Sequence, residues 1–600
     1  MCEHECRALL AVRPGLGRAR YLLAISLFRQ GKFVEAIPIL RDLSEVEHWA
    51  PSEDGGVDAR SVELYLSNAL KREGDLAGAL RHAQTAAKLA PNDVEVIANL
   101  GLCLSSSGNI DQAAVCFEKV IRLAPNLPFG YHGLAEVRNA MGDSLEAIAL
   151  YRKAAELCPP QVPLLMDIAE SLKGLDDSPT AEALANKIHS ASPSVRSNVL
   201  LASCLSERGK ADEALPLAKT AVSMDPESWS AWAVLGTTQL AARNREESNA
   251  ALLKSLELNP AQGSAWHALV QNGLISEDLV MGMQSALTSN SLNPANLSML
   301  NYSLARSLEK LGRYEESYAA YAEANHAARL HKFGNEAFAR EEYVSSVLAP
   351  IAAVRKTGPL RIGGATSGNP KPIFVFGMIR SGTTLLEQIL SLDSKVGAGG
   401  EVLFWREYWR EALSATHGTL DEGALIGLRE RYERVLARIC PGKEVVVDKM
   451  PLNYELAGLL AMVFPDAPMI HLSRNPLDNC FSIFATVNRS RLAFMHDVEA
   501  IGAAYQTYHR AMIEWEQIGL PNTLHVRYED LVSNQEEWTR KVVEHCGLQW
   551  QDEFMHPETN RHLAATPSFV QVQLPVYQSS VSRAMPFERC LPSAWRNLAL

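Results

Sequence analysis

The sequence lacks the features that mark secreted and membrane-spanning proteins. Its 10 cysteines include no C-x-x-C pair, so we expect free thiols rather than a disulfide framework or a zinc site of that spacing. The strongly apolar stretches, such as residues 456–464, are far too short to cross a bilayer. The first residues lack the basic region and apolar run of a signal peptide. We therefore expect a cytoplasmic protein without a membrane span.

An excess of positive charge is also missing. The chain has 57 Lys and Arg against 69 Asp and Glu, a net charge of −12, which argues against nucleic acid as a partner. No second ligand pair follows Cys2, His4 and Cys6 at zinc-site spacing, so no metal is expected. At roughly 100–200 residues per domain, a chain of 600 residues is too long for one core.

A repeat of about 34 residues is present in the N-terminal half. Six prolines follow one another at spacings of 34, 34, 34, 33 and 34 residues: Pro91, Pro125, Pro159, Pro193, Pro226 and Pro260. Glycines precede the first three prolines by 17 residues, and alanines follow these glycines by five: Gly74, Gly108 and Gly142, then Ala79, Ala113 and Ala147. Such a period indicates stacked helical hairpins, each with a glycine turn, a close alanine contact and a proline stop.

The segments 108–125 (GNIDQAAVCFEKVIRLAP) and 142–159 (GDSLEAIALYRKAAELCP) resemble tetratricopeptide (TPR) repeats. The resemblance covers roughly residues 18–335, weakens near Asp176 and Arg243, where the turn glycine is missing, and returns around Gly312. We expect an all-α TPR superhelix with capping helices over residues 1–353. The resemblance implies a concave groove that takes a protein or peptide partner.

The pattern changes after residues 354–370, which are rich in Gly, Pro, Ser and Thr and are interpreted as a linker. Short apolar runs then alternate with helical segments at 372–377, 444–448, 467–473 and 522–529. This alternation predicts an α/β domain with a mostly parallel sheet over residues 371–600.

The first of these runs leads into a candidate anion-binding loop. PIFVFG (372–377) continues as MIRSGTTLLEQIL (378–390), the layout of a strand, a glycine-containing turn and a helix. A Walker A loop has a lysine where Thr383 stands, so an ordinary nucleoside triphosphatase is disfavoured. The groups expected to hold a 5′-phosphosulfate are the cation, hydroxyls and backbone of Arg380, Ser381, Gly382, Thr383 and Thr384.

A second anion-binding pair is expected about ninety residues later. Arg474 ends the apolar run 467–473, and Ser482 follows eight positions on in a predicted helix. An arginine at a strand end and a hydroxyl two turns into the next helix can hold one phosphate from two sides.

Together these motifs resemble the sulfotransferases that use 3′-phosphoadenosine 5′-phosphosulfate (PAPS). The loop RSGTTLL looks most like that of the tyrosylprotein sulfotransferases, and TPR repeats ahead of such a domain resemble a group of bacterial TPR–sulfotransferase chains. The resemblance continues in family order through GAGGE with Glu401, VVVDKMPLN with Lys449, LSRNPLDNCFS with Arg474 and Ser482, VRYEDLV with Tyr528, and TPSFVQVQLPVYQSSVSR from residue 566. It implies a P-loop-like α/β fold with PAPS as co-substrate and no metal.

The resemblance also implies residue roles. Glu401 would be the base, Lys449 would stabilise charge on the leaving oxygen, and Ser568 would be a further transition-state donor. The 3′-phosphate and neighbouring groups would be held by Arg474, Ser482, Tyr528 and Arg583. Two positions depart from the tyrosine-specific members, because Thr486 and Arg583 stand where these have an arginine and a lysine.

The acceptor stays open at this point. A protein tyrosine, a carbohydrate hydroxyl and a small phenol are all compatible with the motifs. Two other classes also stay open: a TPR interaction scaffold with an inactive transferase domain, and a kinase or nucleotidase with an unusual phosphate loop.

Overall fold

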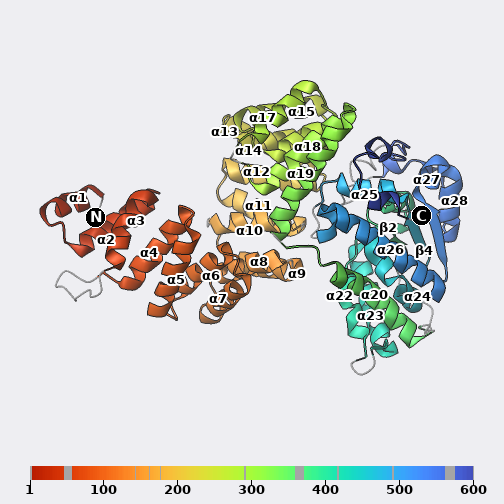
Figure 1. Ribbon diagram of the computed structural model, residues 1–600, viewed down its shortest axis with the longest axis horizontal. Coiled ribbons are helices and arrows are strands. Elements are labelled where there is room, and N and C mark those ends of the chain that lie inside the picture. The colour runs from red at the N-terminus through yellow and green to blue at the C-terminus, as the bar shows by residue number, and fades with distance from the viewer. Residues whose placement is uncertain are drawn as a thin grey trace. The chain divides into compact units, whose positions relative to one another are not determined.

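The computed structural model describes residues 3–45, 57–141, 143–160, 163–175, 177–289, 292–334, 336–358, 362, 370–414, 418–488, 492–560 and 575–598 (Figure 1). The chain forms two compact units, Met1–Ser248 and Asn249–Leu600. Gly142 and Asp176, which the repeat pattern singles out, lie outside the described residues.

The first unit is built from antiparallel helices. They are α1 (Glu3–Val12), α2 (Gly17–Arg29), α3 (Phe33–Ser44), α4 (Ala59–Arg72), α5 (Leu76–Leu89), α6 (Val94–Ser106), α7 (Ile110–Leu123), α8 (Pro128–Met141), α9 (Ser144–Leu157), α10 (Pro163–Gly174), α11 (Ser178–Ala191), α12 (Val195–Glu207), α13 (Ala211–Met224) and α14 (Trp229–Ala241). Helix α15 (Arg245–Leu258) spans the boundary between the units.

The repeat punctuation predicted from the sequence is confirmed where it is described. Each of the six periodic prolines stands two residues after the end of a helix, as Pro91 does after α5 and Pro125 after α7. The predicted close-contact alanines are fully buried between helices. Gly74 and Gly108 occupy the left-handed turn between paired helices, with φ of 86° and 79°. Arg243 takes that conformation where the glycine is missing, with φ of 64°.

The second unit begins with further helices of the repeat type. They are α16 (Gly263–Gln271), α17 (Glu277–Leu287), α18 (Pro294–Lys310), α19 (Tyr314–Phe333) and α20 (Arg340–Thr357). Their buried side chains belong to the same hydrophobic core as one face of the sheet that follows, from Leu252 to Trp595. The final repeat helices and the α/β fold therefore pack as one unit.

The α/β part contains a five-stranded, all-parallel sheet in the order β2-β3-β1-β4-β5. Its strands are β1 (Lys371–Phe376), β2 (Val396–Gly400), β3 (Val445–Asp448), β4 (Met469–Ser473) and β5 (Thr523–Arg527). The four strands predicted from apolar runs are confirmed, and so is the fold class. Strand β2 was not predicted, since its sequence VGAGG has a single β-branched residue.

Helices cover both faces of this sheet. The α-helices of this part are α21 (Thr383–Leu390), α22 (Phe404–Tyr408), α23 (Glu422–Ile439), α24 (Ala457–Val463), α25 (Pro476–Phe484), α26 (Val498–Ile518), α27 (Tyr528–Ser533), α28 (Gln535–His545) and α30 (Ser593–Arg596). Short 3₁₀ segments are η1 (Trp409–Ala412), η2 (Pro451–Leu456), η3 (Ala493–His496), η4 (Asp552–Met555), η5 (Pro557–Thr559) and η6 (Met585–Phe587).

Alternate residues of β1 show how the two faces are filled. Phe374 and Phe376 join the large core that contains α20, α24 and α26, whereas Ile373 and Val375 join a second core with α21 and α28. This period of two is the signature of a strand buried on both faces.

Specific bonds join the last repeat helices to the α/β part. The Asn325 side chain on α19 donates to the Phe484 carbonyl at the end of α25 over 2.8 Å. The hydroxyl groups of Tyr343 on α20 and Tyr454 on η2 are 3.0 Å apart. Both bonds hold repeat-type helices against the elements that carry the candidate site.

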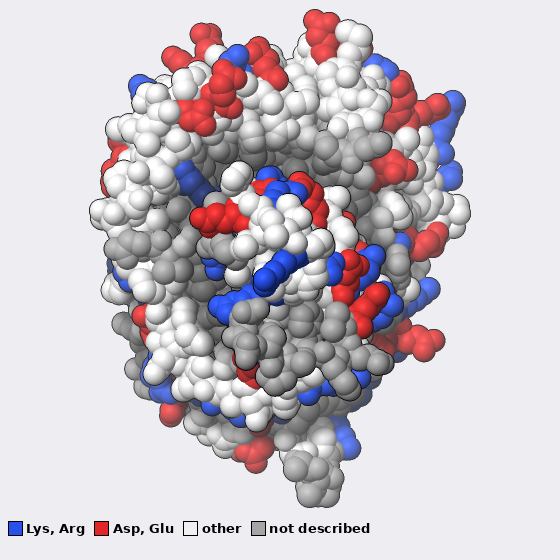
Figure 2. Space-filling view, turned by 90° about the vertical axis from the view of Figure 1, so that its left-hand side faces the viewer, with Lys and Arg blue, Asp and Glu red and all other residues white. Residues whose placement is uncertain are grey.

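The charged surface is mixed. Figure 2 shows Lys and Arg side chains interspersed with Asp and Glu on the face drawn. Among the described residues, no helix has the length and apolar character needed to cross a membrane.

Candidate active site

The predicted site residues follow the carboxyl ends of the five parallel strands. Arg380 lies in the loop after β1, Glu401 directly follows β2, and Lys449, Arg474 and Tyr528 directly follow β3, β4 and β5. Strands β2 and β3 lie on one side of β1, and β4 and β5 lie on the other. Ligands of open parallel sheets bind at the carboxyl ends beside such a reversal of strand order.

The loop between β1 and α21 is tight and requires its glycines. A Cβ atom at Gly377 would lie 2.1 Å from the Leu472 carbonyl oxygen. Gly382 has a φ of 105°, and a Cβ atom there would lie 2.6 Å from the Tyr528 ring. Arg380 has a φ of 67°, which is rare for a residue with a side chain. Glycines therefore fit the two close approaches in this loop, whereas Arg380 takes a backbone conformation that its residue type does not favour, as residues in binding loops commonly do.

Hydroxyl groups collect at the start of α21. Ser381, Thr383 and Thr384 are all buried. The Ser381 hydroxyl has no hydrogen-bond partner among the described residues. The first amides of a helix, with its dipole, attract an anion. A buried hydroxyl without a partner can donate a further hydrogen bond to an anion bound there.

The two predicted anion-binding motifs meet in space. The Arg380 Nε donates to the Ser482 hydroxyl on α25 over 3.4 Å. The Arg474 guanidinium donates to the carbonyls of Arg380 and Ser580 over 3.1 and 2.6 Å, and it lies 4.8 Å from the centre of the Tyr528 ring. Its Nε is buried without a partner among the described residues.

Arg583 is also nearby, but it is already paired. Its Nε and one terminal nitrogen donate to both carboxylate oxygens of Glu309 on α18, each over 2.7 Å. The Tyr321 hydroxyl on α19 lies 3.4 Å from the same guanidinium. Burial alone raises the pKa of Glu309, but the Arg583 guanidinium lowers it, to about 2.

The arginines of this site interact electrostatically with one another, and Arg474 also interacts with the carboxylates of Asp478 and Glu529. Burial, followed by the charges of Arg474 and Arg583, lowers the pKa of Arg380 to about 10. Burial also lowers the pKa of Arg474. Like charges held close together out of water destabilise one another, and an anion bound among them would relieve this repulsion.

Glu401 and Lys449 form the other half of the site. The Lys449 ammonium donates to the Glu401 carboxylate over 2.8 Å. Lys449 is completely buried, whereas the Glu401 side chain is 45% exposed. A second carboxylate, that of Glu387 on α21, lies 4.0 Å from the same ammonium and is almost fully buried. The carboxylate open to an incoming acceptor is thus Glu401.

Asp448 lies immediately before Lys449 and is fully buried. Burial raises the pKa of Asp448 to about 7, although the Tyr432 hydroxyl donates to its carboxylate over 2.6 Å. The hydrogen bond from Tyr432 joins this carboxylate at the end of β3 to α23.

Among the predicted site residues, contacts join Arg380 to Ser482 and Arg474, Arg474 to Tyr528, and Lys449 to Glu401. Ser568 lies outside the described residues. The sequence interpretation missed Glu387, Asp448 and Glu309. Glu387 and Asp448 stand inside the quoted motifs, but nothing in their spacing shows which atoms they contact. Glu309 is far away in the repeat segment, and no signal in the sequence pairs it with Arg583.

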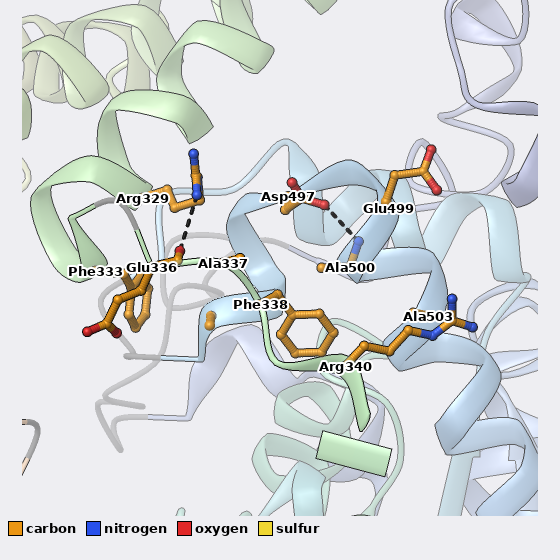
Figure 3. A pocket seen from close by; sticks show the side chains of 11 residues that line it. Arg329, Phe333, Glu336, Ala337, Phe338, Arg340, Asp497, Glu499, Ala500 and Ala503 are labelled. Atoms are coloured by element: carbon orange, nitrogen blue, oxygen red, sulfur yellow. Dashed lines mark hydrogen bonds between the residues drawn. The ribbon is translucent and has the colours of Figure 1, made fainter. Parts of the chain in front are cut away.

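A separate pocket of about 340 Å³ lies at another place in the second unit (Figure 3). It is formed by the end of α19, the segment before α20 and the start of α26, and Arg329, Phe338 and Asp497 are among its lining residues. The Arg329 guanidinium donates to the Glu336 carbonyl, and the Asp497 carboxylate accepts from the Ala500 N–H at the start of α26. None of the predicted site residues lines this pocket.

Comparison with known families identifies the two parts of the chain. Residues 372–552 match the family described as "Sulfotransferase family". Residues 17–42, 70–134, 130–161 and 205–273 match families described as "Tetratricopeptide repeat". The chain therefore carries tetratricopeptide repeats followed by a sulfotransferase-family domain, and the resemblance stated from the sequence is confirmed.

Individual relatives are distant. An "Uncharacterized protein" of Aquifex aeolicus is 25% identical over 84% of this chain and 69% of its own length. The protein-tyrosine sulfotransferase of Drosophila melanogaster is 25% identical over 31% of this chain and 40% of its own length. Protein-tyrosine sulfotransferase 1 of Danio rerio is 23% identical over 36% of this chain and 65% of its own length. The matched region is thus less than two thirds of either named enzyme.

Among solved structures, the tetratricopeptide repeat protein YrrB matches 31% of this chain and 96% of its own chain, with 22% identity and a TM-score of 0.27.

Proposed function

We propose that the chain is a sulfotransferase that moves the sulfuryl group of PAPS to an acceptor hydroxyl. The observation that carries this proposal is the placement of two groups after the carboxyl ends of one parallel sheet: buried arginines and hydroxyls with two unpartnered hydrogen-bond donors among the described residues, and the exposed Glu401 paired with the buried Lys449. The unpartnered Ser381 hydroxyl and Arg474 Nε fit the two anionic ends of such a donor. The names of the distant relatives support the same reaction class.

In this proposal the residues divide into three tasks. Arg380, with the Ser381–Thr384 backbone and hydroxyls, holds the 5′ side of the donor. Arg474, Ser482 and Tyr528 hold the 3′-phosphate, with Arg583 beside them. Fixing the donor in line with the acceptor supplies much of the rate gain in a displacement of this kind.

Glu401 and Lys449 would act on the reacting atoms. As the acceptor oxygen bonds to sulfur, Glu401 takes the hydroxyl proton, and the bond from sulfur to the phosphate oxygen breaks. Lys449 donates to that leaving oxygen and stabilises its developing charge. Adenosine 3′,5′-bisphosphate then leaves with the electron pair of the broken bond.

The acceptor that we propose is a protein tyrosine, with the repeats as the element that recruits the protein. The repeat class and the names of the tyrosine-sulfating relatives support this choice. Carbohydrate and small phenol hydroxyls are the alternatives that an acceptor screen separates from it.

The proposal that PAPS is the sulfuryl donor is tested by calorimetric titration with adenosine 3′,5′-bisphosphate and with ATP. A transfer assay with radiolabelled PAPS follows. We expect the bisphosphate to bind tightly and ATP not to bind tightly. Arg474→Ala should weaken it by about 1.5–3 kcal/mol, the contribution of a charge-assisted hydrogen bond. Tight ATP binding together with an unchanged Arg474→Ala variant would contradict the assignment.

A further inference from the structure

The end of strand β2 is irregular at the point where it presents the proposed base. The pairing of β2 with β3 shifts register between Ala398 and Gly400. Gly400 has a φ of 68°. A bulge of this kind changes the direction of the residue that follows it, and bulges are common beside active sites. Here the residue that follows is Glu401.

Gly400 is held from both sides. Its N–H donates to the Glu387 carboxylate over 2.8 Å, and its carbonyl accepts from the Lys449 backbone N–H over 3.0 Å. The second bond joins the bulge to β3, and the first joins it to α21. Glu387 is therefore the side chain that fixes the backbone immediately before the proposed base.

Glu387 also faces the ammonium of Lys449. Its second carboxylate oxygen lies 4.0 Å from the Lys449 Nζ, whereas that of Glu401 lies 2.8 Å away. Burial raises the pKa of Glu387, while Lys449 and the Gly400 N–H oppose that rise. A carboxylate this deeply buried is costly unless it is paired, and its two partners here belong to the two halves of the proposed catalytic pair.

The neighbourhood of Glu387 contains further titratable groups. Asp448, Glu401 and the Cys440 thiol interact electrostatically with Glu387. Each of these groups lies on β3 or at the end of β2 or α23, whereas Glu387 comes from the helix that begins with Thr383 and Thr384. Glu387 thus connects the donor-binding helix to the proposed base.

We propose that Glu387 is a positioning residue, which holds the bulge at Gly400 so that Glu401 and Lys449 point at the same place beside the bound donor. This inference rests on the proposed function for its catalytic part. Its structural part, the hydrogen bond that holds the bulge, is independent of the reaction.

Two conservative variants separate the hydrogen bond from the charge. Glu387→Gln keeps an oxygen that accepts from Gly400 but has no charge. Glu387→Asp keeps the charge but is shorter by one carbon–carbon bond of about 1.5 Å, too short for a hydrogen bond to Gly400 without backbone movement. Glu433→Asp is the matched control, because Glu433 pairs with Arg429 on α23 away from the site.

The first measurement is steady-state transfer from PAPS in the full chain. We expect Glu387→Gln and Glu433→Asp to keep kcat within roughly threefold of the wild type. Glu387→Asp should lower kcat by roughly 10–100-fold, the usual effect of removing a group that orients a reacting one. The KM for PAPS and the affinity for the bisphosphate should change by less than about threefold in all variants, because the residues proposed to bind PAPS are unchanged.

The second measurement is hydrogen exchange of the peptide that contains residues 396–403. Glu387→Asp should lose protection there, and Glu387→Gln should keep it. An Asp variant that matches the wild type in exchange, or a Gln variant as impaired as the Asp variant, would overturn the inference. If the wild type does not transfer sulfate from PAPS, the proposed function fails, while the exchange result still decides whether Glu387 holds the bulge.

Discussion

At the scale of single residues, the two members of the proposed catalytic pair differ in access. Lys449 is fully buried beside Glu387 and Glu401, whereas the Glu401 side chain is 45% exposed. A base must reach the proton of the acceptor, but a group that stabilises the leaving oxygen is most effective in a site without water. The exposed position of Glu401 and the buried position of Lys449 are therefore those that the proposed reaction requires.

Glu401→Gln tests the base directly. The kcat of the variant should fall by about 10²–10⁴-fold, the usual contribution of a positioned base. Its affinity for the bisphosphate should stay nearly intact, because Glu401 acts on the acceptor and not on the donor. Single-turnover transfer and calorimetry measure the two quantities. A variant that keeps more than about a tenth of the wild-type rate would remove Glu401 from the role.

Asp448 predicts a pH dependence of stability. Its pKa is raised by burial to about 7 in the folded chain, whereas an unfolded aspartate has a pKa of about 3.9. Between these values the folded state binds more protons than the unfolded state, so the free energy of unfolding falls as the pH rises. The contribution is fully present below pH of about 4 and is lost as the pH rises through about 7, at about 1.4 kcal/mol per pKa unit.

Asp448→Asn removes this titration. Urea unfolding between about pH 4 and about pH 8 should show a shallower decline for Asp448→Asn than for the wild type. Asp466→Asn, at an exposed position, is the control and should keep the wild-type slope. Equal slopes for Asp448→Asn and the wild type would show that Asp448 does not carry the effect.

At the scale of elements, the sequence predicted what depends on local chemistry. Proline stops and turn glycines set the helix ends, and apolar runs set four of the five strands. Strand β2 escaped prediction because Gly397, Gly399 and Gly400 carry no β-propensity. Their small size is needed for packing, since a Cβ atom at Gly399 would lie 2.7 Å from the Val447 carbonyl oxygen on β3.

The candidate site, like the fold, was predictable only where it depends on local sequence motifs. Arg474 was proposed because it follows an apolar run and precedes Ser482 by eight residues, and Lys449 was proposed because the segment VVVDKMPLN resembles a family motif. Glu387 and Glu309 were not found, because their partners are fixed by a bulge and by packing between distant helices. Neither contact has a spacing in the sequence that reveals it.

The turn at Arg243 offers an element-scale prediction. A residue with a side chain in the left-handed region costs about 1–2 kcal/mol, and Arg243 is exposed there with a φ of 64°. Arg243→Gly should therefore stabilise the first unit by roughly 0.5–1 kcal/mol, after the greater flexibility of glycine in the unfolded chain is subtracted. Thermal unfolding measures the gain, and Gly108→Ala should give a loss. A destabilised Arg243→Gly variant would contradict this account.

The Glu309–Arg583 ion pair leads to a second prediction about stability. Both side chains are nearly buried, and removing one partner of such a pair costs about 3–5 kcal/mol because the other charge is left unpaired. Glu316 makes a similar two-point pair with Arg313, but Glu316 is exposed and Arg313 is only partly buried. Loss of this second pair should therefore cost much less. Urea unfolding of Glu309→Gln and Glu316→Gln compares the two. Equal losses would show that burial does not distinguish the pairs.

At the scale of the whole molecule, periodicity and packing divide the chain at different places. The repeat period supports a TPR region over residues 1–353, and those limits stay a prediction. The compact units divide near residue 248. Helices α18, α19 and α20 share a core with the sheet, and Glu309, Asn325 and Tyr343 bond to elements of the α/β part. The last repeat helices therefore belong to the same compact unit as the α/β part.

Two truncated chains test this difference. A chain that begins at Asn244 keeps α15 and the whole second unit, whereas one that begins at Lys371 removes α18, α19 and α20 and leaves Arg583 unpaired. The first should unfold cooperatively and bind the bisphosphate within about threefold of the full chain, because it keeps the hydrophobic core that the repeat-type helices share with the sheet. The second should lose cooperative unfolding and aggregate, since it exposes the apolar surface that those helices cover. Circular dichroism and calorimetry make the comparison.

A comparison of the chain from Asn244 with the full chain tests the role of the repeats before residue 244. If these repeats recruit a protein acceptor, the chain from Asn244 should transfer sulfate to a small phenol at the rate of the full chain. It should lose most of its kcat/KM for the protein acceptor, because remote binding energy acts on the large substrate alone. Equal efficiency of both chains on the protein acceptor would assign the first unit to another task. Loss of the small-phenol reaction with intact bisphosphate binding would instead place part of the acceptor site itself in the first unit.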